Sequence, residues 1–253
     1  MHAIILAAGR GSRLREHNPE GRPKCLMEFG GRSLLERHLD LLNQLKVRQV
    51  DLVVGYEADQ IVQHVGELVS RPEVAFHFNP RFQQGSVISL LAAKDTLQQR
   101  NDCLVMDADV LYHPEILRRL VESRHANAYL LDRDFIPGDE PVKIAVRDGL
   151  MVDFRKRLEP GLQYDYLGES VGFFRFSAGS CVALADECAR FEAEGLNDAP
   201  HEEALRNLLL KDPGAYAFED VSGLPWLEID FPEDVIRARE KILPAIRQVF
   251  PGY

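Results

Sequence analysis

Short apolar runs alternate with amphipathic stretches through the first half of the chain. The apolar runs predict strands at residues 3–8, 49–54, 74–78 and 103–106. Stretches with apolar residues at helical spacing lie between these runs and predict helices at residues 34–45, 58–69 and 86–97, the first of them capped by Ser33. Alternation of this kind is typical of βαβ units, so we expect an α/β fold with a doubly wound, mostly parallel sheet.

The alternation breaks in the second half. Strand-like segments follow one another from residue 128 to residue 176, and Asp148-Gly149 predicts a hairpin turn between strands at 142–146 and 150–154. The predicted elements end with helices at about 177–194 and 201–210, a last strand at 216–218 and a final helix from Pro232. Since no repeat or linker marks a boundary, we expect one domain over residues 1–253, with halves of about 1–125 and 126–253 and a β-rich insertion in the second.

Composition narrows the classes of partner. The formal charge of −10, from 40 acidic and 30 basic residues, argues against a nucleic-acid backbone as ligand. Four cysteines without a CxxC pair indicate neither a zinc site nor a disulfide scaffold, and they fit a reducing cytoplasm. No apolar stretch approaches the ~20 residues of a membrane span. We therefore expect a soluble protein with small-molecule partners, and the sequence leaves a homo-oligomer open.

A loop rich in glycine and arginine directly follows the first strand. It reads Leu6-Ala-Ala-Gly9-Arg10-Gly11-Ser12-Arg13-Leu14, and glycines there let backbone N–H groups approach phosphate oxygens. A dinucleotide site would need a third glycine where Leu14 stands and a helix that starts within the loop, whereas a polar run at 17–23 follows here. The Walker pattern has no match. With Lys24 close behind, the loop predicts a nucleoside triphosphate site rather than a structural turn.

Three motifs together resemble one known family. They are, in order, the loop, Arg22-Pro-Lys24-Cys-Leu and Gly31-Arg-Ser-Leu-Leu-Glu36. Together they are similar to the signature of the nucleotidyltransferases that activate sugar phosphates and alcohol phosphates. The resemblance implies a Rossmann-like sheet of the glycosyltransferase-A type and catalytic roles for Lys24 and Arg13. It also implies nucleotide contacts from Leu6, Ala8, Gly9, Gly11 and Ser12.

Two pairs of carboxylates are candidates for a magnesium site. Asp107-Ala-Asp109 ends the strand at 103–106, at the sheet edge where open α/β folds bind ligands, and Glu228-Ile-Asp230 precedes the final helix. The resemblance implies that Asp109, also catalytic, and Asp230 share Mg²⁺, with Asp107 nearer the nucleotide sugar. The alternative for either pair is a strand-end turn or a helix cap.

Further candidates lie around the expected acceptor and base. Lys143 and Lys156 could hold an acceptor phosphate or be solvated surface lysines, and Gly168-Glu169 resembles the family segment whose glutamate faces the acceptor. Residues 79–90 resemble a base-binding and ribose-binding stretch of phosphocholine and inositol-phosphate cytidylyltransferases, which nominates Gly85 and Ser86. Trp226, with acids nearby, could bind an ammonium group. A polyol would use the same acids, so this choice stays open.

The resemblance implies transfer of CMP from CTP to a phosphorylated alcohol, amino-alcohol or phosphonate such as phosphocholine, with release of pyrophosphate. The first half would bind the nucleotide and the second half the acceptor. One alternative is a sugar-1-phosphate uridylyl- or thymidylyltransferase. The other is a non-catalytic, nucleotide-binding regulatory subunit.

Overall fold

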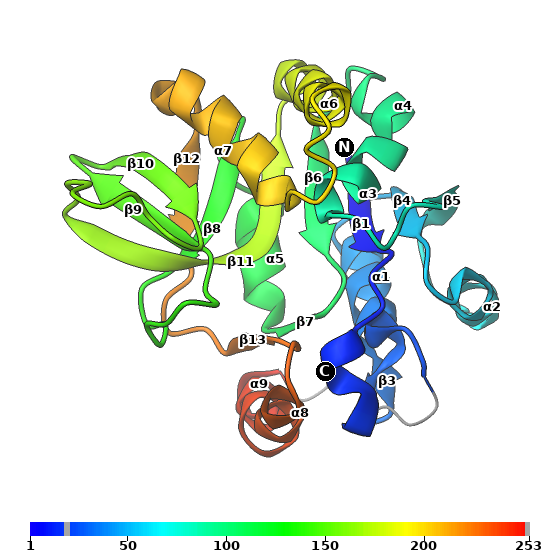
Figure 1. The fold of residues 1–253 in the computed structure, drawn as a ribbon. Coiled ribbons are helices and arrows are strands. Elements are labelled where there is room, and N and C mark those ends of the chain that lie inside the picture. Colours follow the sequence, from blue (N-terminus) through cyan, green and yellow to red (C-terminus); the bar gives the residue numbers. More distant parts are fainter. Residues whose placement is uncertain (18–20, 251–253) are drawn as a thin grey trace.

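A mixed nine-stranded sheet runs through the molecule (Figure 1). The structure is a computed structural model that describes residues 1–17 and 21–250; residues 18–20, part of the predicted polar run, lie outside the described residues. The strand order is β10-β9-β11-β6-β1-β4-β5, with β8 paired to β11 and β12 paired to β8. The parallel strands of the first half are β1 (His2–Ala7), β4 (Gln49–Val54), β5 (Glu73–Phe78) and β6 (Cys103–Asp107). The predicted α/β class and these strands are confirmed.

Helices cover both faces of the sheet because its parallel strands are apolar on both sides. One buried cluster joins the sheet to α1 (Leu34–Gln44), α2 (Ala58–Glu67) and α5 (Pro114–Val121). Another joins it to α3 (Ser86–Ala92), α4 (Lys94–Leu97), α6 (Ala178–Ala193) and α7 (His201–Lys211). The Ser33 hydroxyl accepts the Glu36 N–H at 3.0 Å, which confirms the predicted cap. The single helix predicted at 86–97 is wrong, since the backbone breaks it at Ala93, and α5 was not predicted.

The second half adds strands to one side of this sheet. They are β8 (Ala128–Asp132), β9 (Lys143–Arg147), β10 (Leu150–Arg155), β11 (Tyr166–Phe176) and β12 (Ala217–Asp220). The predicted hairpin at Asp148-Gly149 joins β9 to β10. The long strand β11 pairs antiparallel with β6, so the insertion continues the central sheet instead of forming a separate one.

A small two-stranded ladder lies at the end of the sheet. It pairs β7 (Val110–Tyr112) with β13 (Trp226–Glu228), so the strand predicted at 216–218, observed as β12, is not the last one. The chain then forms α8 (Pro232–Arg237), a π-helical turn (Ala238–Ile242) and α9 (Leu243–Val249). The remaining short elements are the 3₁₀ turns η1 (Ser12–His17), η2 (Lys24–Leu26) and η3 (Pro213–Ala215), and the strand pair β2 (Glu28–Phe29) and β3 (Arg32–Ser33).

Two further features concern membranes and cysteines. No helix in the described part of the chain combines the length and the apolar character that crossing a membrane demands. All four cysteines are buried, and none of them forms a disulfide.

Gly172 lets β11 pass close to the end of β6. Its φ is +80°, and a Cβ atom added there would collide with the Asp107 carboxylate. We expect Gly172→Ala to lower the free energy of unfolding by about 2 kcal/mol, because the left-handed backbone and the collision both cost energy. Urea denaturation measures this loss.

Gly149→Ala is the matched control, since Gly149 has φ +77° in the hairpin turn and an added Cβ meets no atom within 4 Å. Its free energy of unfolding should fall only by the cost of the left-handed backbone, about 1 kcal/mol. Equal losses in the two variants would show that Asp107 does not constrain β11.

Candidate functional site

The side chain of Lys24 joins two distant parts of the chain. Its Nζ donates to Asp109 Oδ2 and to Asp230 Oδ1, both at 2.6 Å, and the three side chains are only 14–25% exposed. Burial alone would lower the pKa of Lys24, but the charges and hydrogen bonds of the two carboxylates outweigh it and raise this pKa. Lys24 is therefore a permanent cation at this point. The sequence had nominated all three residues.

The β7–β13 ladder explains how these residues meet. Glu228 pairs with Val110, and the Ile229 N–H donates to the Asp109 carbonyl at 2.9 Å. This fixes the backbone after β13 beside the backbone after β6. Asp230 is thus held next to Asp109 by main-chain bonds, independently of Lys24.

Glu228 completes a group of three carboxylates. One oxygen each of Asp109, Glu228 and Asp230 lie within 4.8 Å of one another. Burial and the charges of Asp109 and Asp230 raise the pKa of Glu228, while Lys24 and Arg13 help to lower the pKa of Asp230 against its burial. Carboxylates that repel one another at such separations suit a divalent cation with oxygen ligands. The donor set therefore fits the expected metal.

The alternative role of Asp230 as a helix cap is taken by another residue. Asp234 Oδ2 accepts the N–H groups of Asp230 and Phe231, at 3.0 and 2.7 Å. The Asp230 side chain therefore remains available to Lys24.

A cavity of about 280 Å³ opens on one side of this group. We name it the Lys24 cavity, and its lining includes Leu6, Ala8, Gly9, Lys24, Ser86, Asp107, Asp109, Lys156, Glu202 and Glu228. The structure thus brings together most of the residues nominated for the nucleotide. Ser12 is exposed on η1 and is not among the residues that line this cavity.

Gly11 and Asp107 border the Lys24 cavity in different ways. Gly11 has φ +55°, and a Cβ there would lie 2.6 Å from Lys24 Cγ, so the glycine lets the lysine stem pass. Asp107 is enclosed, and burial together with the charges of Glu202 and Asp109 raises its pKa. The loop arginine Arg13 lies with Cζ 5.0 Å from the Phe231 ring centre and with Nη1 3.8 Å from Asp230 Oδ2.

Gly85 and Ser86 connect the two halves of the chain. The Gly85 N–H donates to the Asn197 carbonyl at 2.9 Å, and the Ser86 hydroxyl accepts the His201 N–H at 2.8 Å. Ser86 therefore caps α7 while it lines the Lys24 cavity. Their nomination as base and ribose contacts stays a prediction.

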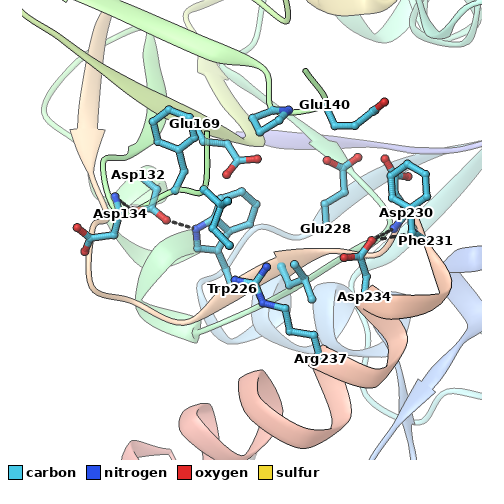
Figure 2. Close-up of a pocket in the computed structure, with 14 residues that line it drawn as sticks. Asp132, Asp134, Glu140, Glu169, Trp226, Glu228, Asp230, Phe231, Asp234 and Arg237 are labelled. Atoms are coloured by element: carbon cyan, nitrogen blue, oxygen red, sulfur yellow. Dashed lines mark hydrogen bonds between the residues drawn. The ribbon is translucent and has the colours of Figure 1, made fainter. Parts of the chain in front are cut away.

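A second cavity, of about 190 Å³, opens on the other side of the carboxylate group (Figure 2). We name it the Trp226 cavity, and its lining includes Asp132, Asp134, Phe135, Glu140, Glu169, Trp226, Glu228, Asp230, Phe231, Asp234 and Arg237. Glu228 lines both cavities, so the three carboxylates lie at their junction. Two ligands in these cavities would meet beside Lys24.

The two lysines nominated for an acceptor differ in their surroundings. Lys156 lines the Lys24 cavity, and its Nζ lies 3.2 Å from Glu140 Oε2. Lys143 donates instead to the backbone carbonyls of Pro141 and Lys156, at 3.3 and 2.7 Å, and lines neither cavity. The structure thus gives Lys143 a bracing position between two loops.

Two groups near the site were not nominated from the sequence. His38 is fully buried beneath Asp107-Ala-Asp109, with Nε2 3.2 Å from the Ala108 carbonyl and Nδ1 3.0 Å from Tyr112 Oη. Burial lowers its pKa to about 4, so it is a neutral brace. Strand alternation had already placed Glu228 and Asp230 on one face, but only Asp230 was nominated as a metal ligand.

Comparisons with known proteins identify the family and the shared fold. The model of the MobA-like NTP transferase domain matches residues 3–156, more than half of the chain. The structure of the inositol-1-phosphate CTP transferase from T. maritima superposes with a TM-score of 0.75 and 21% identity, covering 99% of this chain and 96% of that one. This likeness shows that the fold is shared.

Three relatives extend the comparison. A bifunctional IPC transferase and DIPP synthase from Rubrobacter xylanophilus is 30% identical over 95% of this chain, and a CMP-5'-(3-aminopropyl)phosphonate synthase from Streptomyces rubellomurinus is 27% identical over 98%. The chain spans only 52% and 40% of their respective lengths. A UTP–glucose-1-phosphate uridylyltransferase from Haloferax volcanii is 30% identical, with 96% of each chain covered. The chain belongs to the family of MobA-like NTP transferase domains, and it is a member of the nucleotidyltransferases.

Proposed function

We propose that this chain transfers CMP from CTP to a phosphate or phosphonate oxygen of an alcohol or amino-alcohol acceptor and releases pyrophosphate. The observation that carries the proposal is the position of Lys24, Asp109, Glu228 and Asp230 at the junction of two cavities. A nucleotide in the Lys24 cavity and an acceptor in the Trp226 cavity would place their phosphates at this junction. The relatives that handle CTP or CMP support cytidine as the nucleoside.

The reaction exchanges one bond to phosphorus for another. The acceptor oxygen forms a bond to the α-phosphorus as the bond to the β-phosphate oxygen breaks, and the electron pair leaves with pyrophosphate. Because both reactants are anions, the protein must neutralise charge and fix the line of attack. No residue forms a covalent intermediate in this scheme.

The residues divide this work between them. Lys24, always charged, would donate to the phosphate under attack, and Arg13 would neutralise charge from the side of Asp230. The N–H groups of the loop at Gly9 and Gly11 would hold the remaining phosphates. Asp107 would face the nucleotide sugar. Lys156, within reach of both the Lys24 cavity and Glu140, is the better placed lysine for an acceptor phosphate.

Asp109, Glu228 and Asp230 would hold magnesium, which supplies positive charge to the phosphate oxygens when it is bound. Lys24 and the ion would both offset the negative charge of these carboxylates. In the protein alone, burial and the neighbouring carboxylates raise the pKa of Glu228, and Lys24 offsets this only in part.

A second candidate is a sugar-1-phosphate uridylyltransferase, favoured by the Haloferax relative that matches along nearly its whole length. A pyrophosphate-release screen of CTP, UTP, dTTP, ATP and GTP against phospho-alcohols, phosphonates and hexose 1-phosphates separates the two. We expect turnover with CTP and a phospho-alcohol or phosphonate. Turnover only with UTP or dTTP and a hexose phosphate would instead establish the second candidate.

We expect Lys24→Met to lower kcat/KM by about 10²- to 10³-fold, as loss of one positioned charge donor does in a transition state. Steady-state pyrophosphate release measures it. The control is Lys211→Met, at the exposed end of α7, which should retain activity. A Lys24→Met enzyme that folds and turns over normally would remove Lys24 from the mechanism.

We expect Asp109→Asn and Asp230→Asn each to raise the Mg²⁺ concentration needed for half-maximal activity about tenfold or more, because each removes a charged ligand. Calorimetric titration of Mg²⁺ into the protein with CTP gives a readout besides turnover. Asp59→Asn, an exposed change on α2, is the control. Unchanged magnesium dependence in both site variants would place the ion elsewhere.

A further inference from the structure

The Trp226 cavity carries an excess of negative charge. Seven carboxylates line it, from Asp132, Asp134, Glu140, Glu169, Glu228, Asp230 and Asp234. Among the described residues that line it, Arg237 is the single lysine or arginine. A neutral or anionic ligand would leave this charge without compensation.

Several of these carboxylates already have partners. Asp132 Oδ2 accepts the Trp226 indole N–H at 2.7 Å, and its Oδ1 accepts the Asp134 N–H at 2.8 Å. Asp230 accepts from Lys24, and Glu140 lies 3.2 Å from Lys156.

Two more of the lining acids are also accounted for. Asp234 caps the start of α8 by accepting the N–H groups of Asp230 and Phe231. Glu228 belongs to the carboxylate group at the junction. Of the last two, Asp134 is exposed, so the partly buried Glu169 is the carboxylate that remains to be explained.

Glu169 lies on β11, and its side chain makes no hydrogen bond or ion pair to any described residue. Its strand neighbours in register are Asp132 on β8 and Lys143 on β9, but Lys143 Nζ donates to backbone carbonyls instead. Burial and the Asp132 charge raise the pKa of Glu169 to about 7, against the smaller effects of Arg237 and Lys143. A partly desolvated carboxylate of this kind gains most from a ligand that is a cation.

Trp226 supplies the second surface. Because its N–H is held by Asp132, the indole ring has a fixed orientation, and Figure 2 shows Glu169 and Glu228 pointing their carboxylates into the space beside it. A ring face next to a free carboxylate attracts an ammonium group through the ring quadrupole and the charge together. A polyol hydroxyl could donate a hydrogen bond to the carboxylate, but it carries no charge to offset the negative charge of the cavity and gains little from the ring quadrupole.

We propose that the acceptor carries an ammonium group, which the Glu169 carboxylate and the Trp226 ring hold in the Trp226 cavity. This rests on the proposed transfer to a phosphate or phosphonate acceptor. The acceptor is then a short zwitterion, with its phosphorus oxygens at the carboxylate junction and its cation at Glu169. Polyol phosphates and hexose phosphates lack the cation.

The test compares acceptors that differ only in charge. The ammonium probes are phosphocholine, phosphoethanolamine and 2-aminoethylphosphonate, and 3,3-dimethylbutyl phosphate is the uncharged isostere of phosphocholine. With CTP and Mg²⁺, we expect the best ammonium probe to exceed both the isostere and inositol 1-phosphate by about tenfold or more in kcat/KM. Equal turnover of the isostere, or preference for the polyol, would overturn the inference while leaving cytidylyl transfer intact.

Glu169→Gln removes the charge and keeps the shape. We expect it to lower kcat/KM about tenfold for the ammonium probe and to leave the isostere unchanged, because only the cation uses the charge. Glu233→Gln is the matched control, since Glu233 is exposed in the first turn of α8 and does not line the cavity. A uniform loss for both acceptors would make Glu169 merely structural and contradict the proposal.

Two further readouts separate the possible failures. The preference for ammonium over isostere should increase as the pH rises through about 7, because Glu169 ionises there and the acceptor phosphate is common to both probes. Calorimetric binding of phosphocholine to the protein with CTP tests the cavity without turnover. Binding without pyrophosphate release would refute the proposed transfer alone, whereas transfer to uncharged acceptors would refute the ammonium site alone.

Discussion

The contact on which the site depends is the ammonium of Lys24 between two carboxylates that are far apart in the sequence. Lys24 follows the first strand, Asp109 lies just after the fourth parallel strand and Asp230 precedes the last helices. Bringing such groups together out of water is costly unless their charges compensate one another. The arrangement is therefore poorly explained by stability alone. It is well explained by a ligand that brings more negative charge and a cation that offsets it.

Main-chain contacts hold these charged side chains in place. Asp109 is held by the β7–β13 ladder, by the His38 contact with the Ala108 carbonyl and by the close passage of β11 at Gly172. Asp230 is held by the same ladder and by Asp234. Because the backbone is fixed before any ligand arrives, little reorganisation is needed when charge develops on a phosphate, which is the condition for effective electrostatic stabilisation.

The sequence predicted the first half of the fold closely, because parallel strands and their helices have strong and distinct periodicities. Prediction failed where local pattern does not decide the structure. The break at Ala93 has no glycine or proline to signal it, and the three-residue strands β7 and β13 gain their identity only by pairing with each other. For the site, motif resemblance nominated Lys24, Asp109 and Asp230, whereas His38 read as one more residue on an apolar helix face. Burial and long-range contact, which sequence alone does not contain, distinguish it.

The two cavities differ in their balance of charge. The Lys24 cavity is lined by Gly9 and by two lysines beside four carboxylates, whereas the Trp226 cavity is lined by seven carboxylates, one arginine and three aromatic rings. Two anionic phosphates repel each other, so an acceptor gains if a remote part of the molecule provides the binding energy that holds its phosphate in line. An acid-rich, aromatic cavity is a source of such energy for a cation. In the proposed transfer, the second half of the chain would thus contribute to the reaction at a distance from the phosphorus atom, by binding a charge opposite to that of the triphosphate.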